Sequence, residues 1–206
     1  MNYLLTLKFD GSGFHVTGCS RTDAGVHAVG FKCNFVSEKE IPLANVISGM
    51  NHFLPSSIAV TDAQTVPEDF NARFDCVSKE YIYRIYNGTV RDPFSVGRAY
   101  HYKYRLDEEM LDRQAKDYIG IHDFSSFRAV GSDVATTVRT IFNAGVFRDG
   151  DTVCFRVEGN GFLYNMVRIM AGTLIYIAEG KIRQGSVPEI LASCDRLCAG
   201  MNPPRS

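Results

Sequence analysis

The 206-residue sequence contains no tryptophan, so its tyrosines and phenylalanines must supply all aromatic packing and stacking. Its formal net charge is only −1, whereas proteins that bind nucleic acids without sequence preference are usually strongly basic. Any site for a polyanion must therefore be a local cluster of lysines and arginines. No apolar run is long enough to span a membrane, and the N-terminus lacks the apolar core of a signal peptide.

The six cysteines, at positions 19, 33, 76, 154, 194 and 198, form no CxxC pair. Neither they nor the histidines show the spacing of a zinc site. We therefore expect reduced thiols, most of them small core residues, in a cytoplasmic protein without a metal. Glycine motifs that bind phosphate and the GxSxG nucleophile elbow are also missing.

Hydrophobic periodicity predicts strands and helices in mixed order. Alternating apolar residues indicate strands at 3–9, 29–36, 58–66, 79–86, 138–147 and 152–157. Helical spacing indicates helices at 43–54, 106–119, 162–178 and 187–198, with Asp107 as the N-cap of the second. This order, with a hairpin at Asp149-Gly150, favours an α+β fold around a mixed sheet rather than a doubly wound parallel fold.

The most compact polar motif is GCSRTDAGVHA, residues 18–28, directly before a predicted strand. An aspartate in a loop with glycine is most often a turn former or a helix cap. Here Arg21 precedes Asp23 by two residues, and small neighbours leave room for a substrate to approach. An ionised aspartate can act as a nucleophile or a general base at neutral pH, so Asp23 is the candidate catalytic residue.

Two further residues are candidates for a substrate site. Arg168 lies in the apolar segment FLYNMVRIMAG, where a guanidinium is costly unless it reaches water or meets an anion. Solvent exposure is one explanation, and pairing with a buried carboxylate, with Asp23 as the candidate, is the other. Tyr81 lies beside Lys79 and Arg84 in KEYIYRIY. A strand tyrosine is usually a core residue, but this basic and aromatic strip also suits stacking on a base next to phosphate contacts.

Four segments resemble, in the same order, the sequence blocks of TruA-type tRNA pseudouridine synthases. They are GCSRTDAGVHAVGFKCNF, NARFDCVSKEYIYRIYNG, HDFSSFRA and GNGFLYNMVRIMAGTL. The resemblance implies two α/β-sandwich-like halves that share a mixed, largely antiparallel central sheet, with a cleft across the middle. The halves would be residues 1–86, which carry the RTDAG loop, and residues 87–206, which carry the FLYNMVR helix.

The resemblance also implies an activity, the isomerisation of uridine to pseudouridine in the anticodon arm of tRNA, typically at positions 38 to 40. No cofactor is implied. Carried over by motif, Asp23 is the catalytic nucleophile and Arg168 pairs with it. Tyr81 packs against the target base, and Arg21 helps to displace that base from the stack. Family members act as homodimers on tRNA, and the expected further RNA contacts are Lys79, Arg84 and Arg128.

The sequence departs from the family pattern before the RTDAG motif. Family members usually have a tryptophan-containing segment and a helix there, whereas Phe14-His15 runs directly into Val16-Thr17. Loss of a whole helix would open the core, so we expect the sequence to omit residues of a disordered segment between His15 and Val16. The family also normally adds a last strand after the region of residues 202–206.

Two alternative functions stay open. A protein of the same fold with impaired catalysis would bind tRNA or act as an RNA chaperone. A carboxylate-dependent enzyme that resembles glycosidases would instead place a second acidic residue opposite Asp23.

Overall fold

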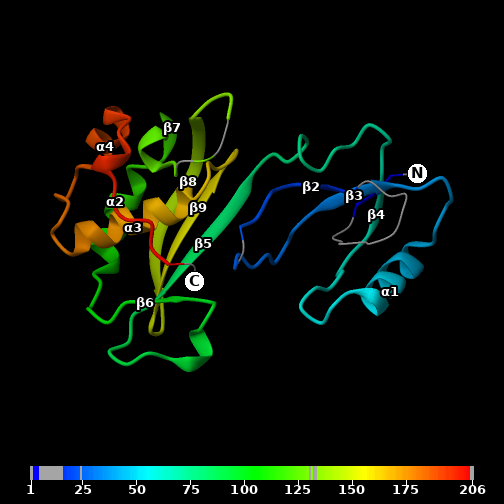
Figure 1. The fold of residues 1–206 in the computed structure, drawn as a ribbon, viewed down its shortest axis with the longest axis horizontal. Helices are drawn as coiled ribbons and strands as arrows, with labels where there is room; N and C mark the ends of the chain where they lie inside the picture. The colour runs from blue at the N-terminus through cyan, green and yellow to red at the C-terminus, as the bar shows by residue number, and fades with distance from the viewer. Residues whose placement is uncertain (1, 5–15, 24, 130, 132–133, 205–206) are drawn as a thin grey trace. The chain divides into compact units, whose positions relative to one another are not determined.

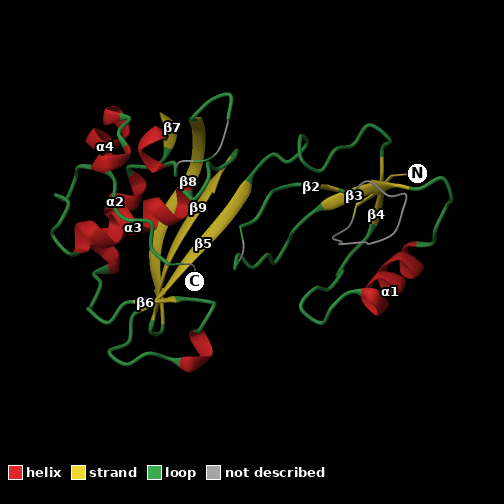
Figure 2. Ribbon diagram, in the orientation of Figure 1, coloured by secondary structure: helices red, strands yellow, loops and turns green. Residues whose placement is uncertain are grey.

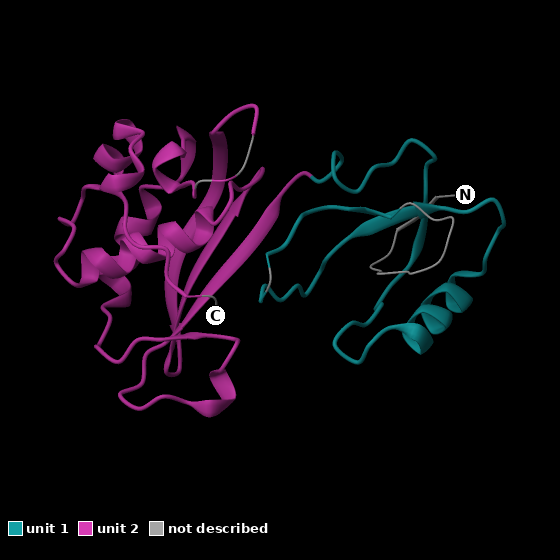
Figure 3. Cartoon of the chain, viewed as in Figure 1, with its two compact units in different colours: residues 1–76 teal, residues 77–206 magenta. Residues whose placement is uncertain are grey.

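The computed structural model describes residues 2–4, 16–23, 25–129, 131 and 134–204, which are coloured in Figure 1. The chain divides into two compact units, residues 1–76 and residues 77–206 (Figure 3). The junction between His15 and Val16, where residues are expected to be missing, lies outside the described residues.

The N-terminal unit contains a four-stranded sheet in the order β2-β3-β1-β4, in which every pair of neighbours is antiparallel. Its elements are β1 (Asn2–Leu4), β2 (Thr17–Gly18), β3 (Cys33–Val36), α1 (Leu43–Phe53) and β4 (Gln64–Val66). A small core joins the sheet to the helix through Cys33, Phe35, Val46, Val60 and Ala63.

Two strands of this unit are shorter than the sequence predicts. The run 29–36 is a strand only from Cys33, and Val29 is fully exposed. The run 58–66 is a strand only from Gln64. Val60 lies outside any ladder because Asn51 of α1 satisfies its backbone, donating to the Val60 carbonyl at 2.8 Å and accepting from its N–H at 2.7 Å. A helix side chain therefore takes the place of a neighbouring strand.

The C-terminal unit contains a five-stranded sheet in the order β6-β5-β9-β8-β7 (Figures 1 and 2). Its strands are β5 (Lys79–Tyr86), β6 (Tyr100–His101), β7 (Gly120–Asp123), β8 (Val138–Asp149) and β9 (Thr152–Gly159). Only the β5–β6 pair is parallel. The hairpin between β8 and β9 turns at Gly150, whose φ of 56° suits glycine. The predicted α+β class with a mixed, largely antiparallel sheet is confirmed here.

The division between the units precedes β5 because this strand pairs along its whole length with β9. The sequence places β5 with the N-terminal half, 1–86, whereas the compact C-terminal unit begins at Val77. The described strands form two separate sheets, and the joining of the two halves through one sheet stays a prediction.

Three helices gather on one side of the five-stranded sheet (Figure 2). They are α2 (Glu108–Lys116), α3 (Met166–Ala178) and α4 (Val187–Ser193). The unit also has three short 3-10 turns, η1 (Pro93–Ser95) between β5 and β6, η2 (Ser125–Phe127) and η3 (Arg196–Cys198). Asp107 is the predicted N-cap of α2, and its side chain accepts from the Met110 N–H at 2.9 Å. Aromatic and aliphatic residues of β5 and β9, such as Tyr83 and Phe155, pack in the same core as Ile169 of α3.

The last two helices are shorter than predicted because single residues adopt left-handed backbone. Asn165 has a φ of 57°, so α3 begins at Met166 rather than at residue 162. Cys194 has a φ of 51°, so α4 ends at Ser193, and the rest of the predicted helix becomes η3.

The expectation that most cysteines are core residues is wrong. Cys33 and Cys154 are buried, Cys19 and Cys76 are partly exposed, and Cys194 and Cys198 are exposed. Cys194 and Cys198 follow the end of α4 at Ser193, whereas the sequence places both in a longer helix. Because the helix ends before them, they do not lie on its buried face. Within the described part of the chain, no helix is both long and apolar enough to cross a membrane.

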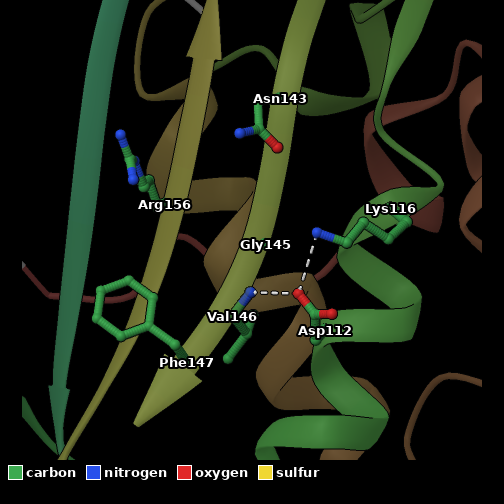
Figure 4. A pocket seen from close by; sticks show the side chains of 7 residues that line it. All are labelled: Asp112, Lys116, Asn143, Gly145, Val146, Phe147 and Arg156. Atoms are coloured by element: carbon green, nitrogen blue, oxygen red, sulfur yellow. Dashed lines mark hydrogen bonds and ion pairs between the residues drawn. The ribbon is translucent and has the colours of Figure 1, made fainter. Parts of the chain in front are cut away.

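Helix α2 covers the part of β8 that β7 does not reach (Figure 4). Asp112 accepts from the Val146 N–H at 2.9 Å, and Lys116 donates to the Ala144 carbonyl at 2.9 Å. Gly145 allows this approach, because a Cβ there would lie 2.9 Å from the Asp112 carboxylate. Side chains of a helix thus satisfy the backbone of an otherwise open strand edge.

Candidate functional site

Asp23 lies in the loop between β2 and β3 of the N-terminal unit. The Val26 N–H donates to the Asp23 carbonyl at 3.1 Å, and Gly25, with a φ of 82°, occupies the third position of this four-residue turn. That φ is the one that a type II turn requires of its third residue, and glycine adopts it without steric cost. At the base of the loop, the Cys19 N–H donates to the Lys32 carbonyl at 2.9 Å. Glycine in the motif therefore serves the turn that carries Asp23.

The two charged residues of the motif differ in exposure. Asp23 is half-buried, whereas Arg21 is exposed. This is the arrangement expected of a carboxylate held in a fixed loop and a cation that can reach a partner in solvent.

Tyr81 lies on the face of β5 that packs against the helices. Its ring makes an edge-to-face contact with Phe162, with the ring centroids 5.0 Å apart. Tyr83, two residues on, is buried on the same face. Arg84 is exposed on the opposite face, so it does not form a single surface strip with Tyr81. Lys79 is half-buried, and it lies on the same face of β5 as Tyr81 because the two residues are two positions apart.

Arg168 is the third residue of α3, and neutral oxygen atoms hold its guanidinium. Its Nη1 donates to Asn165 Oδ1 at 2.9 Å. Its Nε donates to the carbonyl oxygen of Pro203 at 3.0 Å, and Nη2 donates to the same oxygen. The side chain is half-buried, so full exposure to solvent does not explain a charge in this apolar helix.

The position of Arg168 is electrostatically unfavourable. The N-terminal end of a helix carries a partial positive charge, and a cation in the first turn is disfavoured by roughly 0.3–1 kcal/mol. Within the described C-terminal unit, none of the six ion pairs includes Arg168. A site that tolerates this cost is suited to receive an anion.

Arg128 follows η2 in the block HDFSSFRA. Its N–H donates to the Ser125 carbonyl at 3.2 Å, and the next residue, Ala129, donates to the Tyr164 carbonyl at 3.1 Å. The loop is thereby fixed to the segment that leads into α3. The hydrogen bond from Ser125 is the main cause of a lowered pKa of Asp123, and the charge of Arg128 contributes to it.

The structure brings some predicted residues together within each unit. Asp23 and Arg21 share a loop of the N-terminal unit. In the C-terminal unit, β5 packs against α3, so Tyr81 and Arg168 belong to adjoining elements. The pairing of Arg168 with Asp23 joins residues of different units and stays a prediction.

Three residues around Arg168 were not singled out in the sequence. Asn165 stands three residues before Arg168, a spacing at which helix side chains meet, and this spacing is a signal that could have found it. Tyr83 donates its hydroxyl to the Pro204 carbonyl at 2.7 Å. Burial is the main cause of a raised pKa of Tyr83, which therefore stays a protonated donor. No sequence pattern predicts that Pro203 reaches Arg168, because 35 positions separate them.

Two pockets of the C-terminal unit lie away from Tyr81 and Arg168. The pocket in Figure 4, of about 190 Å³, is lined by residues of α2, β8 and β9 around Asp112 and Lys116. A second pocket, of about 400 Å³, is lined by Tyr86, Lys103 and Arg105 among others. Neither lining contains Tyr81 or Arg168. Among the described residues there is also no group of three or more His, Cys, Asp or Glu placed to hold a metal ion.

The fold and these residues define an α+β protein with a loop carboxylate in one unit, and a tyrosine and an uncompensated helix arginine in the other. A sequence profile of the family described as tRNA pseudouridine synthase matches residues 5–75 and 114–205. The chain belongs to the tRNA pseudouridine synthase family.

Known proteins agree with this assignment. The chain is 42% identical over 201 residues to the tRNA pseudouridine synthase A of Geotalea uraniireducens, covering 98% of this chain and 82% of that protein. It is 40% identical over 197 residues to the protein of the same name from Geotalea daltonii, covering 96% and 81%. The corresponding protein of Halalkalibacterium halodurans is 42% identical over 194 residues, covering 94% and 74%.

Proposed function

We propose that this protein isomerises uridine to pseudouridine in tRNA, with Asp23 as the catalytic residue. Relatives that carry the name tRNA pseudouridine synthase A match nearly the whole chain, and this supports the reaction. One structural observation carries the assignment of the site. Among the described residues, the acceptors that hold Arg168 at the start of α3 are neutral, and a carboxylate partner would be favourable in this place.

The proposed reaction needs no external reagent, because it is an isomerisation. The target uridine leaves the base stack, which costs a few kcal/mol, and Arg21 and Tyr81 supply replacement contacts. Asp23 either attacks C1′ of the ribose, forming an ester, or removes the proton of C2′, giving a glycal, and the bond from C1′ to the base nitrogen breaks. The uracil rotates and rejoins C1′ through carbon, while the ester bond to Asp23 breaks or the proton returns to C2′, so that Asp23 is a free carboxylate again. The new carbon position then loses its proton, and the former glycosidic nitrogen gains one. Arg168 orients and stabilises the carboxylate throughout.

Several finer features belong to the same proposal. The target uridines lie in the anticodon arm, at positions 38 to 40, and the protein acts as a cytoplasmic homodimer. Lys79, Arg84 and Arg128 contact RNA outside the target base, and Arg84 does so from the other face of β5.

The substitution Asp23→Asn tests the assignment. It removes the nucleophilic charge and changes little else in shape, so pseudouridine formation should fall by about four orders of magnitude or more, in the range seen when a catalytic residue is lost. The affinity for tRNA should change little. The matched control is Asp69→Asn, an exposed residue of the same unit, which should keep full activity.

The measurements are pseudouridine content in a uridine-labelled tRNA transcript and tRNA affinity by filter binding. Substantial residual activity in Asp23→Asn would disprove the role of Asp23. A wild-type protein that binds tRNA without forming pseudouridine would instead identify a catalytically impaired tRNA-binding protein.

A further inference from the structure

The guanidinium of Arg168 has N–H groups and a positive charge that its described acceptors do not use or neutralise. A guanidinium carries five N–H donors. Among the described residues, Asn165 Oδ1 accepts from Nη1 and the Pro203 carbonyl accepts from Nε and Nη2, so three donors are used and two have no described acceptor. Both acceptors are neutral. Arg168 can therefore still make two charge-assisted hydrogen bonds with an anion, without breaking the contacts that orient it.

Asn165 is suited to this role by backbone and side chain together. Its left-handed φ of 57° turns the chain sharply before α3, and asparagine is one of the few residues that adopt this conformation readily. Its amide oxygen faces the guanidinium three residues later. An aspartate would fit the same backbone and would be favoured at a helix N-terminus, but it would neutralise Arg168.

The Pro203 carbonyl is held in place by the tail that carries it. The tail crosses α3 at Gly172, where an added Cβ would lie 2.1 Å from the Met201 carbonyl oxygen. The Gly200 N–H donates to Thr173 Oγ1 at 2.9 Å, and Tyr83 fixes the next carbonyl, that of Pro204. In Figure 1 this red segment runs from the end of the last helices across α3 toward β5.

We infer that Asn165 and the Pro203 carbonyl are positioning groups that orient Arg168 while leaving its charge unpaired for a carboxylate. Tyr83 is a further positioning residue, because it fixes the tail. The inference rests on the proposed function, in which that carboxylate is Asp23. Donors that are oriented before the substrate arrives need no reorganisation during the reaction.

The substitution Asn165→Asp separates positioning from mere structure. An aspartate fits the left-handed backbone and makes an ion pair with Arg168, so the thermal midpoint should be unchanged or higher. Because Arg168 is then neutralised, the single-turnover rate of pseudouridine formation should fall about tenfold or more, with tRNA affinity changed by less than about threefold. Asn165→Gly keeps the backbone and loses the acceptor, so its rate should fall less, by about three- to tenfold.

Asn143→Asp is the matched control. It makes the same chemical change at an exposed position of β8 and should leave the rate unchanged. A purely structural role of Asn165 predicts full activity for Asn165→Asp, and a rate within about twofold of wild type would overturn the inference. A wild-type protein without activity would contradict the proposed function instead.

A second measurement does not depend on activity. Tyr83→Phe removes the hydroxyl that holds Pro204, so the tail and the Pro203 carbonyl should loosen. The Nε–H of Arg168, followed in ¹⁵N-labelled protein, should then exchange with solvent about fivefold faster or more. Unchanged exchange would show that the tail does not position Arg168, whether or not the protein forms pseudouridine.

Discussion

Arg148 illustrates how a single buried side chain connects distant parts of the C-terminal unit. It lies near the end of β8 with 15% of its side chain exposed, and its Nη2 donates to Glu108 Oε2 at 2.9 Å. The same nitrogen donates to the Leu106 carbonyl and to Asn87. The hydrogen bond from Arg148 is the main cause of the low pKa of Glu108, about 2 against an ordinary 4.5. This contact anchors the first turn of α2 to the sheet.

The pair should give the unfolding free energy a specific pH dependence. A carboxylate with a lowered pKa in the folded state stabilises above its unfolded pKa, and this stabilisation is lost as the pH falls from about 4.5 toward 2. Glu108→Gln should lower the unfolding free energy at pH 7 by about 1–2 kcal/mol and flatten its fall over that window. Urea titrations at pH 7, 4.5 and 3 measure both effects.

Glu109→Gln is the control, because Glu109 is the exposed neighbour in the same helix turn. It removes the same charge near the same helix N-terminus without affecting Arg148. If Glu109→Gln flattened the pH dependence as much as Glu108→Gln, the effect would belong to the helix dipole and not to the Arg148 contact.

Among the elements, α3 depends on a close approach that only glycine permits. Glycine in a helix interior usually destabilises by roughly 0.5–1 kcal/mol relative to alanine. At Gly172 this general rule should reverse, because the tail passes where the alanine Cβ would lie. The atom that the new Cβ would meet is the backbone carbonyl oxygen of Met201, which cannot move aside as easily as the end of a flexible side chain.

A pair of glycine substitutions tests this reversal. Gly172→Ala should destabilise the protein by roughly 1–3 kcal/mol, since it displaces the tail from α3. Gly49→Ala, in α1, has open space around the new Cβ and should stabilise by roughly 0.5–1 kcal/mol. Thermal unfolding midpoints of the two variants and of the wild type measure both effects. Stabilisation by Gly172→Ala would show that the tail does not pack on α3.

At the scale of the whole molecule, the chain has two hydrophobic cores of unequal size. Among the described residues, the core of the N-terminal unit has five buried members, whereas that of the C-terminal unit includes residues from its sheet and from α2, α3 and α4. Cores that do not share buried residues allow separate local unfolding, and the smaller one should open first.

Matched valine substitutions should therefore act locally. Val46→Ala in α1 and Val157→Ala in β9 remove the same atoms from buried positions, and each should cost about 1.5–3 kcal/mol. Hydrogen exchange should show lost protection in residues 16–76 for the first variant and in residues 77–204 for the second. Equal loss in both units from Val46→Ala would mean that the chain unfolds as one cooperative unit.

Local patterns predicted much of the C-terminal unit well. Alternation in KEYIYRIY identified β5, Asp107 was recognisable as an N-cap, and the Asp149-Gly150 pair identified the β8–β9 hairpin. These features depend on residues close together in the chain. The strands expected at 29–36 and 58–66 were predicted too long. In the second of them, the partner that satisfies Val60 is a helix side chain, which alternation does not reveal.

By itself, the sequence determined the family, the α+β class and the identity of the candidate residues, because motif order and periodicity are properties of neighbouring residues. Tertiary structure decided what surrounds them. The tail at Gly172 and the Pro203 carbonyl on Arg168 bring together parts of the chain that are far apart in sequence. Asn165 is close to Arg168 in sequence, but its left-handed backbone appears only in the structure. Their arrangement is set by packing, since an arginine takes its orientation from whichever acceptors the fold brings within hydrogen-bonding distance.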